Sequence, residues 1–287
     1  MNRRAIKATY ESKGLPHIGS LVQQNLQDMY TVLQWNVENK IRVFRLSSDI
    51  TPWGSEYEFT DLPNATEVMA LFKKCGQFAL DNDIRLSFHP GPFNCLASPN
   101  KATVDKTIAE LDAHALQMDL MGLPASHRAK INIHVGGAYG EHDKAMARFC
   151  NNFARLGATT RARLTVENDD KQSLYSTKEL YDTVYRRIGT PIVFDYHHYR
   201  LHPDGQTEVE ALLTALDTWP DDVKPVVHYA ESRSVEYNDP KIKPQAHSDY
   251  IVDYFDDYGF DLDVMIEAKH KELALLRYRD LMMENAA

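Results

Sequence analysis

The stretch RLTVEND, residues 163–169, runs from apolar and β-branched residues directly into a carboxylate. A continuous apolar run of this kind is typical of a parallel strand that is covered on both faces. Glu167 then stands at the end of a buried strand, where an uncompensated carboxylate is costly and requires a cation or strong donors. Six further runs have the same character: IRVFRLSSD (41–49), IRLSFHP (84–90), KINIHVGG (130–137), PIVFDYHH (191–198), KPVVHYAE (224–231) and LDVMIEAK (262–269).

The spacing of these runs predicts the fold. Amphipathic helical patterns lie between them, for example at 104–120, 142–156 and 177–188, and a βα unit occupies about 30 residues or more. We therefore predict an α/β fold, a TIM (β/α)8-type barrel, as a single domain over residues 1–287. A doubly wound sheet is the alternative, but no Gly-rich nucleotide loop follows any run.

The count of strands is one short of eight. Helical periodicity begins near residues 17–39, and AIKATYE (5–11) supplies at best a poor first strand. We expect a barrel whose first strand is irregular or lacking. Such a barrel exposes two ladder edges, so we also expect reduced stability or a partner.

Composition bounds the class of protein. The 287 residues are 43% hydrophobic, which suffices for a substantial core, and the formal net charge of −9 argues against broad nonspecific nucleic-acid binding. The three scattered cysteines, Cys75, Cys95 and Cys150, are expected to be core thiols in a reducing compartment. No apolar run reaches the roughly 18 residues of a membrane helix, and the first residues lack a secretory signal. We expect a cytoplasmic location, or a nuclear one in a eukaryote, and no membrane partner.

Six of the seven runs, all but the first, end in a His, Asp or Glu side chain that can bind a metal ion. Parallel barrel strands direct their carboxyl ends to one face, so side chains distant in sequence converge there. The mixture of imidazoles and carboxylates suits Zn²⁺, Mn²⁺ or Fe²⁺, and the number of donors implies two or three ions. The predicted ligands are His89, His134, Glu167, Asp195, His228 and Glu267, with His198 and His247 in the loops just beyond.

The remaining histidines receive a plainer interpretation. Only one of the adjacent His197 and His198 is expected to face the site, and we favour His198. Surface positions are predicted for the others: His17, His114, His127, His142, His202 and His270. The residues by themselves leave two chemistries open, because adjacent metals serve both phosphodiester cleavage and sugar isomerisation.

Several motifs together resemble those of the UV damage endonuclease family. They are RLSFHPGPFNCLASP (85–99), INIHVGGAYGEHDKAMARF (131–149), LTVENDD (164–170), FDYHHYRLHP (194–203), HYAES (228–232) and VMIEAKHKE (264–272). The resemblance runs from about residue 18 to 272. It implies a TIM barrel related to endonuclease IV that holds two or three divalent ions, most often Mn²⁺, with Zn²⁺ or Mg²⁺ as alternatives. It also implies a monomer that incises damaged double-stranded DNA on the 5′ side of UV photoproducts and other lesions, leaving a 3′-hydroxyl and a 5′-phosphate.

The resemblance assigns roles residue by residue. One ion would be held by His89, His134 and Glu167. Glu167 would be shared with a second ion held by Asp195, His228 and Glu267, and a third ion would use His198 and His247. Glu167, His228 and Glu267 are the expected catalytic residues. Because the family flips the damaged dinucleotide out of the duplex, Pro92 and Phe93 are expected at the lesion. Lys241 and Lys243 are expected on phosphates, since they are basic residues of the long loop after the run at 224–231.

Two positions depart from the family pattern. Pro92 replaces a usual Gln and cannot hydrogen-bond a base edge, and Val226 stands where the family commonly has a Lys that reaches the metals. These departures and the missing first strand keep open a noncatalytic protein that binds damaged DNA. The acidic net charge keeps open a metal-dependent sugar isomerase or epimerase on a related barrel.

Overall fold

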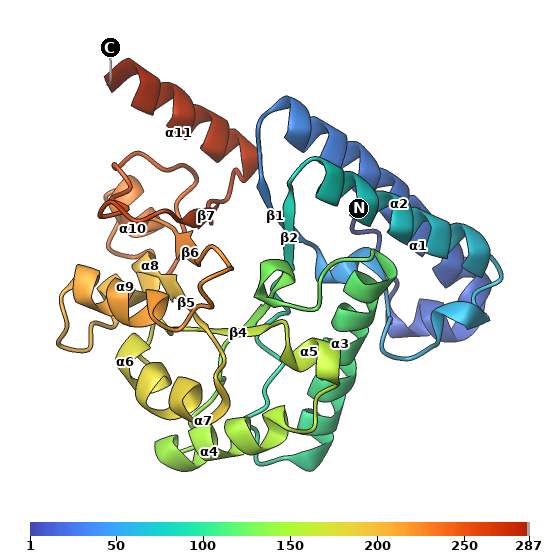
Figure 1. Ribbon diagram of the computed structural model, residues 1–287, viewed down its shortest axis with the longest axis horizontal. Helices are drawn as coiled ribbons and strands as arrows, with labels where there is room; N and C mark the ends of the chain where they lie inside the picture. Colours follow the sequence, from blue (N-terminus) through green and yellow to red (C-terminus); the bar gives the residue numbers. More distant parts are fainter. Residues whose placement is uncertain (286–287) are drawn as a thin grey trace. The chain divides into compact units, whose positions relative to one another are not determined.

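Seven parallel strands, each followed along the chain by a helical segment, form the framework of the protein. The computed structural model describes residues 1–285 (Figure 1). The strands are hydrogen-bonded in chain order, from β1 to β7. Their bounds are β1 Val43–Leu46, β2 Arg85–Phe88, β3 Ile131–Ile133, β4 Leu164–Glu167, β5 Ile192–Asp195, β6 Val226–Tyr229 and β7 Asp263–Ile266.

This strand order decides between the two predicted α/β folds. A doubly wound sheet reverses its strand order at a switch point, whereas the order here never reverses. The predicted TIM-type α/β class is confirmed, and the doubly wound alternative is wrong. The backbone divides into two compact units: Met1–Gly136 with Arg148–Thr165, and Gly137–Ala147 with the chain from Val166 onward. We call them the first and the second unit and describe each by itself; the single domain stays a prediction.

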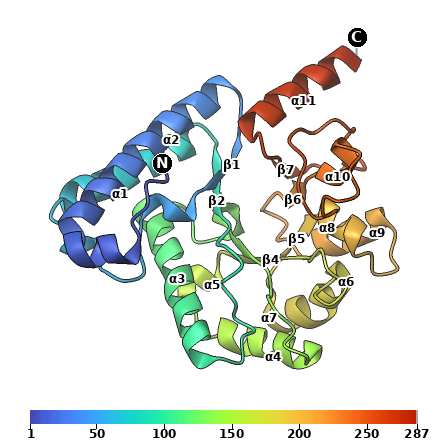
Figure 2. The same ribbon diagram turned by 180° about the vertical axis from the view of Figure 1, so that it is seen from behind.

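In the first unit, β1 to β3 and the start of β4 are accompanied by long helices. Helices α1 and α2 lie side by side in both views (Figures 1 and 2). Their contact is apolar, since Val22, Leu26 and Phe72 are fully buried. The helical segments are α1 Lys7–Glu38, η1 Ser48–Ile50, η2 Phe59–Asp61, α2 Ala65–Asp81, α3 Lys101–Leu120, η3 His127–Ala129 and α5 Ala158–Arg161.

The amino-terminal segment corrects one expectation. Residues 7–11 of AIKATYE belong to α1, and the structure has no strand among residues 1–6, so the suggestion of a poor first strand is wrong. Helix α1 also begins ten residues before the periodic stretch at 17–39. A kink at Gly14 (φ 63°), two residues before Pro16, separates the two parts of α1 and thereby breaks the periodicity.

In the second unit, the end of β4 and strands β5 to β7 alternate with shorter helices. The stretch 177–188, predicted as one helix, is helical throughout but has a π-helical middle. Helix α4, His142–Phe153, begins in this unit and ends in the first. The others are α6 Thr177–Glu179, η4 Leu180–Tyr185, α7 Arg186–Ile188, α8 Tyr196–Leu201, α9 Glu208–Leu216, α10 Arg233–Glu236 and α11 Glu272–Asn285.

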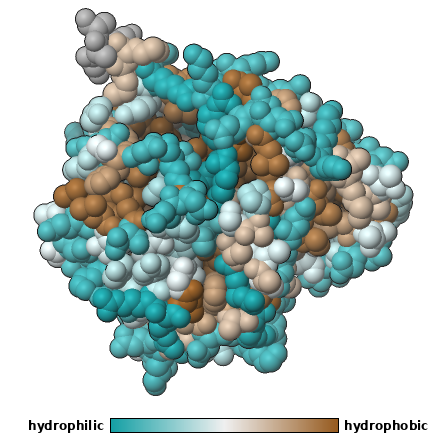
Figure 3. All heavy atoms as spheres, viewed as in Figure 1, coloured by the Kyte–Doolittle hydropathy of each residue, from teal (hydrophilic) through white to brown (hydrophobic). Residues whose placement is uncertain are grey.

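The burial of side chains tests what was expected of the cysteines and of His114. Cys75, Cys95 and Cys150 are buried free thiols, as predicted. The surface position predicted for His114 is wrong: the ring is 1% exposed and packs edge-on against Phe88 at 4.6 Å between ring centroids. The face shown in Figure 3 is largely hydrophilic with apolar patches between. Within residues 1–285, none of the helices combines the length and apolar character needed to span a bilayer.

Candidate metal centre

Four of the predicted ligands of the second unit lie at or next to the carboxyl ends of its strands. Glu167 is the last residue of β4 and Asp195 the last residue of β5. His228 is the third residue of β6, where it pairs in register with Asp195, and Glu267 directly follows β7. The strand-end argument therefore holds for these four side chains.

Three of these side chains converge in a buried cluster. Glu167, Asp195 and His228 each offer one ligand atom, and these atoms all lie within 4.8 Å of one another. The three residues are at most 1% exposed. His228 Nδ1 is 3.2 Å from Glu167 Oε2 and 3.3 Å from Glu267 Oε1, so Glu267 adjoins the same cluster.

The two loop histidines lie at the margin of this cluster. His198, in α8, has its Nδ1 3.3 Å from Glu167 Oε1. His247 has its Nδ1 3.7 Å from Glu267 Oε2, and it is fixed in place by an antiparallel bridge to Ser232. Burial lowers the pKa of His247, although Glu267 opposes this effect. The second unit thus brings together all six ligands predicted within it.

The electrostatics of the cluster favour a cation. Burial, with additional repulsion from Glu167 and Glu267, raises the pKa of Asp195 to about 7, against the opposing influence of His198. Within residues 1–285, Asp195 Oδ2 is buried and accepts no hydrogen bond. A buried carboxylate oxygen without a donor, surrounded by carboxylates and imidazoles, fits a divalent ion of the Mn²⁺ or Zn²⁺ type.

The other two predicted ligands belong to the first unit. His89 directly follows β2 and His134 directly follows β3. Their rings lie side by side, with centroids 5.6 Å apart and planes tilted by 36°. The strand-end argument therefore also places these two imidazoles correctly, each after its own strand.

The predicted lesion residues occupy the tip of the loop after β2. Pro92 is exposed, and Phe93 is 91% exposed. The base of the loop is held firmly, because Cys95 N–H donates to Thr107 Oγ1 at 3.0 Å and Asn152 Nδ2 donates to the Leu96 carbonyl at 2.8 Å. Phe93 is therefore an aromatic ring presented to solvent on an anchored loop, not one packed against the protein.

The predicted phosphate-binding lysines lie in the loop between β6 and β7. Lys241 and Lys243 are both exposed, and neither forms an ion pair with any residue that the structure describes. Nearby acids are engaged locally: Asp239 accepts from the backbone N–H of Lys241 at 2.9 Å, and Glu236 accepts from that of Asp249 at 2.6 Å. The two ammonium groups are thus available to an anion.

Sequence reasoning missed a residue that connects the ligands. Asn168 follows Glu167 directly, is 1% exposed, and hydrogen-bonds to Asp195 and His198. The only signal was an amide next to a strand-end carboxylate, which is also common in ordinary turns. Val226, where the resemblance implies a Lys, is 1% exposed and packs with Val193, Trp219 and Val223, so it supplies no ligand atom.

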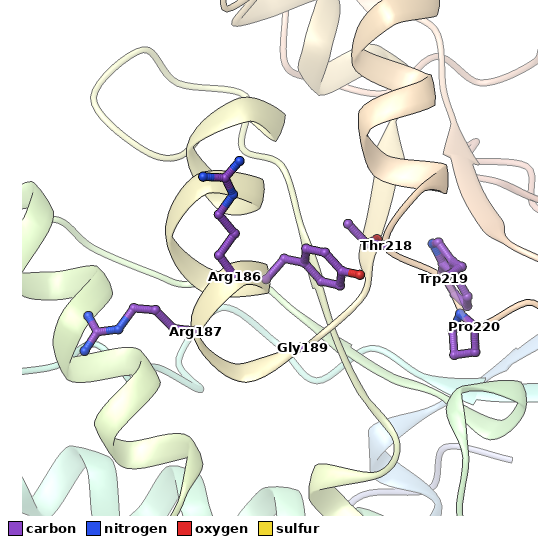
Figure 4. A pocket seen from close by; sticks show the side chains of 7 residues that line it. Arg186, Arg187, Gly189, Thr218, Trp219 and Pro220 are labelled. Carbon is purple, nitrogen blue, oxygen red and sulfur yellow. The ribbon is translucent and has the colours of Figure 1, made fainter.

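The second unit also has a hollow of about 510 Å³ away from these ligands. Figure 4 shows Gly189, Trp219 and Pro220 in its wall, with Arg187 extending away from Trp219. Gly189 precedes β5 and Pro220 precedes β6, so the hollow lies at the amino ends of these strands. In TIM-type folds that end contributes to stability rather than catalysis.

Comparisons with known proteins agree over nearly the whole chain. A sequence profile of the family described as UV-endonuclease UvdE matches residues 3–286. A UV DNA damage endonuclease from Bacillus cereus (strain G9842) is 33% identical over 271 residues, covering 91% of this chain and 81% of that protein.

Solved structures give the same picture. The crystal structure of SacUVDE matches with a TM-score of 0.85 and 28% sequence identity, covering 99% of this chain and 93% of that one. Endonuclease IV from Thermus thermophilus matches with a TM-score of 0.54 and 14% identity, covering 89% of this chain and 94% of that one. The second match shows a shared fold alone.

Proposed function

Because the chain belongs to the UV-endonuclease UvdE family, we propose that it incises duplex DNA at ultraviolet photoproducts and other lesions. The cut would fall on the 5′ side of the lesion and leave a 3′-hydroxyl and a 5′-phosphate. The observation that carries the proposal is the buried cluster of Glu167, Asp195 and His228, whose donor atoms lie within 4.8 Å of one another.

The cluster has the composition expected for a centre of two or three divalent ions, with Mn²⁺ as the first candidate. Glu167, Asp195, His228 and Glu267 would hold the central ions, and His198 and His247 a further one. His89 and His134 stay predicted ligands on the strength of their strand-end positions and of the family resemblance. When bound, such ions lower the pKa of a water molecule and neutralise charge on the leaving oxygen of a phosphodiester.

The chain's own residues would prepare this chemistry. Glu167 lies between two imidazoles, with Oε1 3.3 Å from His198 Nδ1 and Oε2 3.2 Å from His228 Nδ1. Its two oxygens thus face different histidines, and Glu167 would be the carboxylate shared between ions. Glu267 has the same arrangement between His228 and His247. We assign Glu167, His228 and Glu267 as the catalytic residues.

DNA recognition would come from the two loops. Phe93, being 91% exposed on an anchored loop, can stack on a base or wedge between bases, at a cost to the duplex of a few kcal/mol. Pro92 would stiffen the tip beside it but cannot replace the hydrogen bonds of the usual Gln. Lys241 and Lys243 would contact phosphates, which fix the position of a duplex without reading its sequence.

The test is relaxation of supercoiled plasmid, irradiated or not, with Mn²⁺ or with EDTA. Wild-type protein should nick only the irradiated plasmid and only with Mn²⁺, whereas Glu167→Gln should bind less Mn²⁺ and not nick. Glu56→Gln, which removes an exposed carboxylate, is the matched control and should nick normally. Equal nicking by Glu167→Gln would overturn the metal assignment.

Further readouts separate the alternatives. DNA ligase should reseal the nicks directly, because it requires a 3′-hydroxyl and a 5′-phosphate, and an end-labelled oligonucleotide locates the cut relative to the lesion. Binding of irradiated duplex without nicking would instead favour a noncatalytic damage-binding protein. Turnover of a free sugar without DNA binding would favour the isomerase or epimerase. A monomer, the expected state, is tested by light scattering.

A further inference from the structure

At the end of the β4–β5 ladder, a side-chain amide forms the hydrogen bonds in place of the backbone. The two strands pair in register through Val166 with Ile192 and Glu167 with Val193. One residue later, the Asn168 side chain takes over: its Oδ1 accepts from the Asp195 N–H at 2.8 Å, and its Nδ2 donates to the Asp195 carbonyl at 3.0 Å. Both residues of this step are buried, so the two hydrogen bonds of the amide fix the backbone of Asp195 at the end of the ladder.

The backbone of Asn168 is then free for a second task. Its carbonyl oxygen lies 2.9 Å from His198 Nδ1. A carbonyl only accepts, so this contact places the proton of the neutral ring on Nδ1. Two carboxylate oxygens near Nδ1, Glu167 Oε1 at 3.3 Å and Asp195 Oδ2 at 3.9 Å, are also acceptors and favour the same tautomer. The lone pair of His198 is therefore on Nε2.

Asp195 is oriented by the same group of contacts. Its Oδ1 accepts from the backbone N–H of His198 at 2.8 Å, as the cap of helix α8. Its Oδ2 accepts no hydrogen bond from the described residues. Rotation of the carboxylate would break the cap, so Oδ2 is the atom left to a ligand.

We propose that Asn168 is a positioning residue that presents Asp195 Oδ2 and His198 Nε2 as the two ligand atoms at this edge of the metal centre. The inference takes the metal from the proposed function, whereas the hydrogen bonds of Asn168 are independent of it. Metal-ligating histidines usually donate their second N–H to a carbonyl or carboxylate, and loss of such supporting groups typically costs 10–100-fold in metal affinity.

The first measurement uses metal-free wild-type protein. Long-range ¹H–¹⁵N correlation at pH 8, with EDTA and with His198→Gln for assignment, reports which ring nitrogen of His198 carries the proton. We expect the proton on Nδ1. A proton on Nε2 would overturn the proposal, whatever the activity of the protein.

The second measurement compares two asparagines that make the same contact. The side-chain amide of Asn25 also bonds to both backbone groups of one residue: its Oδ1 accepts from the Arg3 N–H at 2.9 Å and its Nδ2 donates to the Arg3 carbonyl at 3.1 Å. By titration calorimetry, Asn168→Ala should bind Mn²⁺ about 10–100-fold more weakly than wild type, and Asn25→Ala should bind it normally. High Mn²⁺ should restore nicking by Asn168→Ala, with KM for DNA unchanged.

A second variant guards against a failure to fold. Asn168→Asp keeps the acceptor for the Asp195 N–H but replaces the donor, and it should also lose Mn²⁺ affinity. Wild-type affinity in both Asn168 variants, or an equal loss in Asn25→Ala, would overturn the proposal.

The outcomes for the two proposals are distinct. Wild-type protein that binds Mn²⁺ but never nicks irradiated DNA defeats the proposed function and leaves the role of Asn168 intact. Nicking of irradiated DNA by wild type, together with unchanged Mn²⁺ affinity in the Asn168 variants, supports the proposed function and defeats the role of Asn168. Wild-type protein that binds no Mn²⁺ overturns both.

Discussion

Replacing Asp195 by asparagine should stabilise the metal-free protein at neutral pH while it removes a metal ligand. Burial and neighbouring carboxylates raise the pKa of Asp195 from 3.8 to about 7 in the folded protein. Between these two pKa values, the Asp195 carboxyl is protonated in the folded state and ionised in the unfolded state. The stability that this proton provides is fully present below pH 3.8 and disappears as the pH rises through 7.

The size of the effect follows from the two pKa values. Each pKa unit corresponds to about 1.36 kcal/mol, so a rise from 3.8 to about 7 makes the ionised side chain cost about 4 kcal/mol of unfolding free energy at pH 8. Asparagine carries no charge at any pH. Asp195→Asn should therefore be more stable than wild type by about 2 kcal/mol at pH 5 and about 4 kcal/mol at pH 8.

Urea unfolding in EDTA, followed by circular dichroism between pH 5 and 8, measures this difference. Asp105→Asn is the control: Asp105 is paired with Lys101 and Arg155, which lower its pKa, so its loss should not stabilise. Mn²⁺ at 100 times its Kd should then stabilise wild type by about 2.7 kcal/mol, and the Asn variant much less. A variant that is no more stable than wild type, or a difference independent of pH, would refute the reasoning.

Three further results are expected. Phe93→Ala should lower kcat/KM on irradiated duplex by about 5–150-fold, the equivalent of one base–aromatic stack, and should leave the melting temperature unchanged because the ring is 91% exposed; wild-type kinetics would remove Phe93 from the DNA interface. The double variant Lys241→Ala/Lys243→Ala should reduce the slope of log K against log salt by about 2, measured by fluorescence anisotropy, and an unchanged slope would place both lysines off the DNA. Gly136→Ala should be destabilised in thermal unfolding, because its Cβ would lie 2.3 Å from Cys95 Sγ and its φ is +99°; normal stability would contradict this packing.

The strand ends were predictable because one physical rule governs them. A carboxylate such as Glu167 or Asp195 at the end of an apolar run must meet a compensating group, and parallel strands bring such ends together. The sequence alone therefore located six of the predicted ligands on their strands. His198 and His247 follow the strands at no fixed spacing, and they were chosen with the help of the family resemblance.

Other features depend on contacts that spacing does not encode. Asn168 acts through its amide and its carbonyl on two different segments, and an amide after a strand has many ordinary explanations. His114 was expected at the surface because it lies in a helical stretch away from the strand ends, yet its ring packs against Phe88 and is buried. The start of α1 was missed because the kink at Gly14 interrupts the 3.6-residue repeat on which the prediction relied.

The apolar residues beneath the cluster have a consequence for how strongly an ion would be held. Val193 and Val226 share strand faces with Asp195 and His228, two residues nearer the amino ends, and both are closed off with Trp219 and Val223. These four side chains form an apolar layer on the amino-terminal side of Asp195 and His228. Because apolar side chains respond weakly to charge, they leave the negative potential of Asp195 largely unscreened on that side, which would strengthen the hold of the cluster on a cation.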